Sequence, residues 1–422
     1  MGERSDGAGA VWTDEQRREL GHERLSSAGG KTASERRSGA NNQTLPYNHT
    51  LPYGRQSIVD EDIEAVAEVL RGDWLTTGPA VRRFEEDLSA LAGGVPTVAV
   101  TSGTAALHVA YAAAGVGAGD EVVCAPMTFV ATAATAVLHG ATVMFADVSQ
   151  ETGNLLPEAA AAAMTGKTRV VAAVDYAGHP AQVDDLSKIA HDGGALLLED
   201  AAHSIGGAWQ RRPVGSLADL TTFSFFPTKN LTTAEGGAVA SPIPDLARRA
   251  ARFRNHGLVR EPALMREPGE GGWHQEVHEF GLNYRLPDVL CALGSSQLRR
   301  LAWFKGRRAA IHARYTAGLS DVDGVRTPVT LPGADPMWHL YPLRVRDGRR
   351  RALYDHLRAN GIGVQVNYIP VYWHPVFADL GYRRGMCPNA ELFYAEELSL
   401  PLFPDLSDDD VDRVVDLVRA FL

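Results

Sequence analysis

The chain contains one lysine, Lys229, whose surroundings favour covalent chemistry with a carbonyl group. It follows the apolar run LTTFSFF, precedes a glycine pair, and is one of only five lysines beside 36 arginines. Nearby aromatic and small residues predict a partly desolvated ammonium group, which lowers the pKa of a lysine and favours the nucleophilic amine. From this segment alone, a solvated loop lysine is the competing interpretation. Lys229 is therefore a candidate for forming a Schiff base.

A second segment, VTSGTAAL, is typical of an anion site. An apolar strand runs through Ser102, Gly103 and Thr104 directly into an alanine-rich helix. The first N–H groups of a helix have no partner inside it, and glycine lets a ligand approach the backbone closely. Ser224, five residues before Lys229, offers another hydroxyl at a strand end. A phosphate fits these groups, although a simple helix cap explains Ser102 equally well.

Two further strand ends carry side chains suited to a flat heterocycle. The segment GGALLLEDAAHSIGG ends a buried run near Asp200, where a carboxylate needs a cationic or hydrogen-bonded partner. A protonated ring nitrogen is such a partner, and the alternatives are a structural pairing with an arginine or exposure to water. Phe129 begins a helix after another strand, where its ring can stack on a heterocycle or pack in the core. His203, taken alone, is typical of a structural histidine.

The elements that must position these residues alternate along the middle of the chain. Short apolar runs separated by helical stretches predict a mostly parallel sheet, because strands of such sheets are buried on both faces. The expected strands span residues 97–100, 121–125, 142–145, 169–174, 195–198, 220–225 and 237–240. In such sheets ligands bind beyond the carboxyl ends of the strands, so the groups described above should meet there.

The four groups together match one cofactor. A phosphate cradle, a carboxylate for a ring nitrogen, an aromatic ring and a lysine for an aldehyde are complementary to pyridoxal 5'-phosphate (PLP). The motifs SGTAAL, EDAAHSIG, FSFFPTKNLTTAEGG and GLNYRL, in this order, resemble the DegT-type family of sugar aminotransferases. The resemblance extends from about residue 46 to the C-terminus. It implies an α/β protein with the fold type I aminotransferase architecture.

The resemblance also implies a role for each matching residue. Lys229 and Asp200 would be catalytic, with Lys229 bound to the aldehyde and Asp200 paired with the ring nitrogen. The other cofactor contacts would be Phe129 and Ala202 on the ring faces, His203 at the ring hydroxyl, and Gly103, Thr104 and Ser224 at the phosphate. Asn283 would reach the phosphate across a subunit interface, which implies a homodimer with shared sites, although a loop cap is its simpler interpretation. The substrate entrance would comprise Tyr53, Trp74, Leu75, Thr76, Asn367 and Tyr368, for which interface or core packing is the alternative.

Stretches such as LPYGRQSIVDEDIEAV and CPNAELFYAEELSLPLFPDL resemble the transaminase subgroup of the pseudaminic acid pathway. That subgroup aminates C4 of a UDP-linked 4-keto-6-deoxy-N-acetylhexosamine, and glutamate is the usual donor in the family. Phe226, Asn367 and Tyr372 stand where histidine is usual in the subgroup. Because a lost polar contact changes substrate choice strongly, another nucleotide-linked ketosugar or a keto-cyclitol of antibiotic biosynthesis stays open. A catalytically silent PLP-binding regulator is the alternative of another class.

The composition limits the classes of protein to which this chain can belong. The 422 residues, 45% hydrophobic and 22% charged, suffice for a large domain and a smaller one. A net charge of -10 argues against nucleic acid as a partner. The sequence lacks a long apolar run and an apolar export signal, which predicts a cytoplasmic protein that does not span a membrane. Three widely spaced cysteines predict reduced thiols and no metal site.

Three segments are expected along the chain. Residues 1–45 are poor in large apolar side chains and predict a disordered extension, with a short docking helix in VWTDEQRREL as the alternative. Residues 46–297 would form the large PLP-binding domain. Residues 298–422 would form the small α/β domain, with strands in MWHLYPLRV and IGVQVNY and a final helix capped at Ser407.

Overall fold

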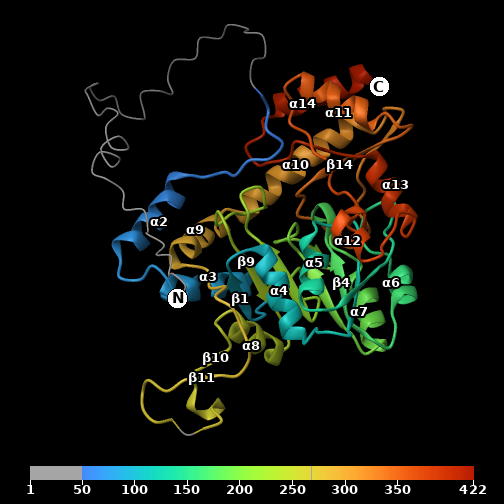
Figure 1. Ribbon diagram of the computed structural model, residues 1–422. Helices are drawn as coiled ribbons and strands as arrows, with labels where there is room; N and C mark the ends of the chain where they lie inside the picture. Colours follow the sequence, from blue (N-terminus) through green and yellow to red (C-terminus); the bar gives the residue numbers. More distant parts are fainter. Residues whose placement is uncertain (1–49, 268) are drawn as a thin grey trace, which may run out of the picture. The chain divides into compact units, whose positions relative to one another are not determined.

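The structure is a computed structural model that describes residues 50–267 and 269–422 (Figure 1). The disordered extension predicted for residues 1–45 lies outside the described residues. Strands and helices alternate up to about residue 298, and helices around a small sheet follow. Among the described residues, no helix is long and apolar enough to cross a membrane.

Seven strands form the central sheet, as the apolar runs predict. In spatial order they are β1 (Thr97–Val100), β9 (Gly237–Ala240), β8 (Leu220–Ser224), β5 (Leu196–Asp200), β4 (Thr168–Val174), β2 (Glu121–Cys124) and β3 (Thr142–Phe145). Strand β9 runs antiparallel to β1 and β8, and all other neighbours are parallel. The mostly parallel sheet expected from the sequence is therefore confirmed.

The helices of this part of the chain pack on the sheet or on one another. They are α2 (Asp60–Arg71), α3 (Pro79–Leu91), α4 (Gly103–Ala114), α5 (Ala131–Leu138), α6 (Pro157–Ala163), α7 (Val183–Asp192), α8 (Pro244–Phe253) and α9 (Asp288–Leu298). Helix α4 packs on β8 and β9, α5 on β2 and β3, and α7 on β4 and β5, whereas α2 and α9 pack on one another. Every residue of β8 is buried, which requires cover on both faces of the sheet. Strand β5 runs two residues further than expected, because Asp200 still pairs with Thr222 of β8.

The C-terminal part has its own hydrophobic cluster. An antiparallel sheet of β12 (Val325–Arg326), β14 (Tyr341–Val345) and β15 (Glu397–Leu400) lies with α10 (Leu301–Leu319), α11 (Arg350–Ala359) and α14 (Asp408–Phe421). Figure 1 shows α10 running from α9 toward α14, and α14 contacts both α10 and α11. As predicted, MWHLYPLRV contains a strand, and Ser407 caps α14 by accepting a hydrogen bond from the Asp410 N–H. The domain boundary between residues 297 and 298 stays a prediction.

Short elements connect these parts. They are β6 (Ala208–Trp209), β7 (Arg212–Pro213), β10 (Leu258–Val259), β11 (Glu276–Val277), β13 (Ala334–Asp335), α12 (Pro375–Asp379), α13 (Pro388–Glu396) and three 3-10 turns at Tyr176–Gly178, Pro262–Leu264 and Val371–Trp373. Strands β10 and β11 pair in the segment that projects beside α8 (Figure 1).

The prediction of a strand over IGVQVNY is wrong. Its residues make isolated bridges, Leu51 with Ile362 and Gln365 with Ser399, instead of a continuous ladder. The backbone at Gly363 lies against residues 51–53 near the start of the described chain. A Cβ added at Gly363 would meet the Tyr53 nitrogen at 2.6 Å. The segment is thus joined by single bridges to two other parts of the chain, around Leu51 and around Ser399.

Candidate active site

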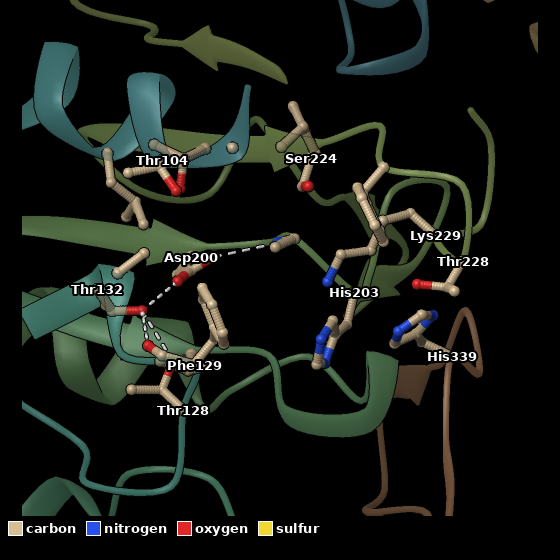
Figure 2. A pocket seen from close by; sticks show the side chains of 18 of the residues that line it. Thr104, Thr128, Phe129, Thr132, Asp200, His203, Ser224, Thr228, Lys229 and His339 are labelled. Carbon is tan, nitrogen blue, oxygen red and sulfur yellow. Dashed lines mark hydrogen bonds between the residues drawn. The ribbon is translucent and has the colours of Figure 1, made fainter. Parts of the chain in front are cut away.

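One cavity of about 500 Å³ opens at the carboxyl ends of β5 and β8, beside the N-terminus of α4. Its lining includes Tyr53, Gly103, Thr104, Thr128, Phe129, Thr132, Asp200, Ala202, His203, Thr222, Ser224, Phe226, Thr228, Lys229, Glu235, His339, Asn367 and Tyr368. Figure 2 shows the side chains of Thr104, Asp200, Ser224 and Lys229 around a common space. The strand-end rule therefore located the cavity correctly from sequence.

Lys229 lies in the turn that follows β8, and its backbone N–H donates to the Phe226 carbonyl at 2.9 Å. Burial lowers the pKa of the Lys229 ammonium to about 8, and the nearby Asp200 carboxylate opposes part of this change. A substantial fraction of the side chain is therefore the neutral amine near pH 8. This state suits attack on a carbonyl carbon, as expected from the surrounding sequence.

Asp200 ends β5, and only 5% of the residue is exposed. Its two carboxylate oxygens accept different donors: Oδ1 accepts the Ala202 N–H at 3.2 Å, and Oδ2 accepts the Thr132 hydroxyl at 2.6 Å. Burial raises the pKa of Asp200, while the bonds from Thr132 and Ala202 and the charge of Lys229 oppose that rise. The carboxylate is thus held in a fixed orientation facing the cavity (Figure 2).

Two histidines form another side of the cavity. The rings of His203 and His339 lie with centroids 4.3 Å apart, and the Tyr368 hydroxyl is 3.1 Å from His203 Nε2. Burial and the charge of Lys229 lower the pKa of both imidazoles well below the usual value, so both rings are neutral at pH 7. His203 Nδ1 is buried and has no hydrogen-bond partner among the described residues.

The opposite end of the cavity has the features of an anion site. Ser102 caps α4, its hydroxyl accepting the Ala105 N–H at 3.0 Å, which leaves the first N–H groups of the helix unpaired within it. A Cβ added at Gly103 would meet the Ser224 side chain at 2.7 Å. Only glycine therefore lets the helix start this close to Ser224. Thr104 adds a hydroxyl next to this position (Figure 2).

Phe129 lines the cavity, and 59% of the residue is exposed, so it is not packed in the core. Ala202 also lines the cavity, as expected. Of the expected entrance residues, Tyr53, Asn367 and Tyr368 are present in the lining. Trp74, Leu75 and Thr76 are exposed and outside it, and so is Asn283, which bridges Asn255. Their predicted functional roles stay predictions.

Three residues at the cavity carried no clear signal in the sequence. Thr128 and Thr132 lie in an alanine- and threonine-rich stretch that predicts only a buried helix. His339 precedes β14, and the one available signal was a polar residue inside the otherwise apolar MWHLYPL. Of the departures from the subgroup pattern, Phe226 and Asn367 line the cavity. Tyr372 does not, because it is buried and its hydroxyl donates to Glu391 at 2.7 Å.

Comparison with known proteins identifies the class of enzyme that this site serves. The family model described as the DegT/DnrJ/EryC1/StrS aminotransferase family matches residues 56–419. The chain belongs to this family and is a PLP-dependent sugar aminotransferase with the fold type I architecture. Family membership thus favours the enzyme over the catalytically silent alternative.

Individual relatives are similar over most of their length. The spore coat polysaccharide biosynthesis protein SpsC of Bacillus subtilis is 39% identical over 88% of this chain and 97% of its own. A putative sugar aminotransferase of Streptococcus pneumoniae, Spr1654, solved in its PMP form, is 27% identical with a TM-score of 0.83, covering 88% and 98% of the two chains. PseC of Helicobacter pylori, an aminotransferase involved in the biosynthesis of pseudoaminic acid, is 28% identical with a TM-score of 0.82, covering 88% and 99%.

The residues of the cavity fit PLP. The Nδ1 of His203 and the hydroxyl of Thr222 are buried polar atoms at the cavity that have no partner within residues 50–267 and 269–422, and a bound ligand can satisfy them. The start of α4 and Ser224 provide donors for a phosphate, while Lys229 and Asp200 provide an amine and a carboxylate on the other sides.

Proposed function

We propose that Lys229 is the residue that binds the PLP aldehyde and that Asp200 pairs with the ring nitrogen. The meeting of this amine and this buried carboxylate in one cavity is the observation that carries the proposal. The remaining contacts are the phosphate with Gly103, Thr104 and Ser224, the ring faces with Phe129 and Ala202, and the ring hydroxyl with His203. When bound, PLP supplies an aldehyde for an amino group and a ring that withdraws electrons.

The chain's own residues then bind, orient and transfer protons. Lys229 Nζ, with a pKa near 8, accepts the proton from the donor's α-carbon and returns it, as a general base and acid should. The ionised Asp200 carboxylate holds a proton on the ring nitrogen. Neutral His203 accepts or donates a hydrogen bond without placing a second charge beside the amine.

We further propose that the amino acceptor is a nucleotide-linked ketosugar of the UDP-4-keto-6-deoxy-N-acetylhexosamine type, aminated at C4, with glutamate as donor. The similarity to PseC and the motifs shared with its subgroup support this substrate. The presence of Tyr53 and Asn367 at the cavity supports a sugar entrance on that side, since amide and phenol groups suit hydroxyl-rich ligands.

A second substrate class has its own support. Phe226 and Asn367 both line the cavity and both replace histidines of the subgroup, so two polar contacts at the entrance differ. These differences favour another acceptor, such as a dTDP-linked ketosugar or a keto-cyclitol. The solved structure of the sugar aminotransferase CalS13 from Micromonospora echinospora is also similar to this chain, with 28% identity and a TM-score of 0.80.

We propose a homodimer in which Asn283 completes the partner's phosphate site. Asn283 is exposed and lies outside the cavity of its own chain, which is compatible with action on a second subunit. The exposed Phe280 and Leu282 beside it provide apolar surface for such an interface.

A panel assay separates these substrates. Purified protein is incubated with ¹⁵N-glutamate and UDP- or dTDP-linked ketosugars or a keto-cyclitol, and the labelled product is assigned by NMR. The proposal predicts label at C4 of the UDP-linked sugar, with kcat/KM at least about tenfold above the alternatives. Preferential labelling of a dTDP sugar or cyclitol would favour the second class, and no transfer to any acceptor would contradict both.

A further inference from the structure

We infer that Thr132, supported by Thr128, is a positioning residue that holds the Asp200 carboxylate as an ionised acceptor. The inference rests on the proposed pairing of Asp200 with the ring nitrogen. It adds a relay of two hydroxyl groups from the cavity lining, bonded to that carboxylate, as a determinant of the ring's protonation.

The relay is a short chain of buried groups. The Thr132 hydroxyl lies 2.6 Å from Asp200 Oδ2, and the Thr128 hydroxyl lies 2.8 Å from the Thr132 hydroxyl (Figure 2). Thr132 is 1% exposed and Thr128 is 3% exposed, so little water competes for these bonds. The Tyr111 hydroxyl donates to the Thr132 backbone carbonyl at 2.9 Å and fixes the start of α5.

The number of available hydroxyl protons determines which group donates in each hydrogen bond of the relay. An ionised carboxylate has no proton to donate, so the single hydroxyl proton of Thr132 must point to Asp200. The 2.8 Å contact then requires that Thr128 donates to Thr132. Protonation of Asp200 removes this order, because Thr132 can then turn to the Phe129 carbonyl at 3.4 Å. The donor order therefore favours the charged form of Asp200.

The other groups around Asp200 do not by themselves account for an ionised carboxylate when the aldehyde is bound. Those that interact electrostatically with it are Lys229 after β8, Asp175 at the end of β4, Tyr111 on α4, Cys124 on β2 and Tyr368 at the entrance. Burial raises the pKa of Tyr111, Cys124 and Tyr368, which are therefore neutral at pH 7. Lys229 is the cation of this group, and its amine is engaged when the aldehyde is bound. The carboxylate then depends on neutral donors, of which Thr132 makes the shortest bond.

The test uses the holoprotein reconstituted with PLP labelled with ¹⁵N in the ring, whose chemical shift reports ring protonation without turnover. In Thr132→Val the ring nitrogen should lose its proton about 1–2 pH units lower than in the wild type, the range expected for a lost bond to a charged group. Thr128→Val should shift the titration in the same direction by less than about one unit. Thr132→Ser, which retains the hydroxyl, should restore the wild-type titration.

Two controls separate this inference from the proposed site itself. Thr135→Val removes an equally buried hydroxyl from the same helix, one that bonds the Ala131 carbonyl instead of Asp200, and should leave the titration unchanged. Asp200→Asn should shift the titration more than any threonine variant does. If Asp200→Asn has no effect, the proposed pairing fails, whereas a shift in Asp200→Asn with wild-type titrations in Thr132→Val and Thr128→Val overturns the relay alone.

A structural defect in one variant does not remove the test. Thermal melting of each holoprotein establishes whether the variant is folded. If Thr132→Val does not fold, Thr128→Val decides the question, because it leaves the Thr132 bond to Asp200 in place. A Thr128→Val titration equal to those of the wild type and Thr135→Val would then overturn the relay.

Discussion

The inner wall of the cavity comes from strand ends of the central sheet and from the helix starts and the turn beside them, whereas the entrance wall comes mostly from loop segments far apart in the chain. The inner wall comprises Thr104, Thr132, Asp200, Ser224 and Lys229, and the entrance wall comprises Tyr53, Phe226, His339, Asn367 and Tyr368. Asp200 and Ser224 end strands of the sheet, Thr104 and Thr132 lie in the first turns of α4 and α5, and Lys229 lies in the turn after β8. In the entrance wall, the Asn367 amide donates to the Tyr53 hydroxyl, and the Tyr368 hydroxyl contacts His203. The first arrangement carries the proposed cofactor contacts, and the second carries the proposed substrate contacts.

Asn367 is the centre of the entrance wall. Its side-chain amide donates to the Tyr53 hydroxyl at 2.7 Å and to Ser399 at 3.1 Å, and its backbone N–H donates to Glu397 at 2.7 Å. Glu397 is fully buried, and burial raises its pKa to about 8. A neutral carboxyl thus supports the entrance at pH 7, in contrast to the ionised Asp200 proposed for the inner wall.

The largest effect should come from the inner wall. Lys229→Ala should reduce the conversion of glutamate to 2-oxoglutarate by about 10⁴-fold or more, because both the covalent anchor and the proton carrier are lost. Lys188→Ala is the matched control, since Lys188 is an exposed lysine paired with Asp192 on α7. Comparable activity in the two variants, measured by oxoglutarate formation, would contradict the assignment of Lys229.

The reactivity of Lys229 in the apoprotein should show the next effect. A pKa near 8 leaves about a tenth of the amine neutral at pH 7, roughly 300-fold more than an amine at the ordinary 10.5. Because the charged form is disfavoured, acetylation by acetic anhydride should rise with pH and level off above about pH 8. Peptide mass spectrometry across pH 6–10 measures this profile, and a rate still rising tenfold per unit at pH 9.5 would refute it.

Changes at the entrance should be smaller and specific for the sugar. Asn367→Ala should lower kcat/KM for the ketosugar about tenfold, mainly through KM, because it releases Tyr53 and removes an amide contact. Asn367→His should change the ratio of kcat/KM between UDP- and dTDP-linked sugars. Gln365→Ala, at an exposed position two residues away, is the control. If kcat/KM for the conversion of glutamate to 2-oxoglutarate fell equally, the entrance and inner walls would not act separately.

The smallest effect should be on stability. Glu397 has an ordinary pKa near 4.5 when unfolded and about 8 when folded, so the folded chain holds the extra proton between these values. The free energy of unfolding should therefore fall as pH rises through this window, and Glu397→Gln should remove about 1 kcal/mol of that fall per pH unit. Urea unfolding at pH 5, 6.5 and 8 compares the two proteins. Parallel pH dependences would show that Glu397 is already ionised in the folded chain.

The contrast between the walls also explains what the sequence can predict. Strand β8 and Lys229 follow from a local apolar run and its end, and the glycine and hydroxyl pattern around Gly103 is equally local. The IGVQVNY segment has the composition of a strand, but close contact at Gly363 and single bridges on either side prevent a ladder. Thr132 and His339 reach the cavity only through packing between distant elements, which no local pattern encodes.

The most direct test of the central claim is to locate the covalent attachment of PLP. The holoprotein is reduced with borohydride and digested, and the modified peptide is sequenced by mass spectrometry. The account predicts that a phosphopyridoxyl group is on Lys229 and is absent from Lys188 and Lys305. A group attached at another lysine, or PLP that binds stoichiometrically without any reducible attachment, would contradict it.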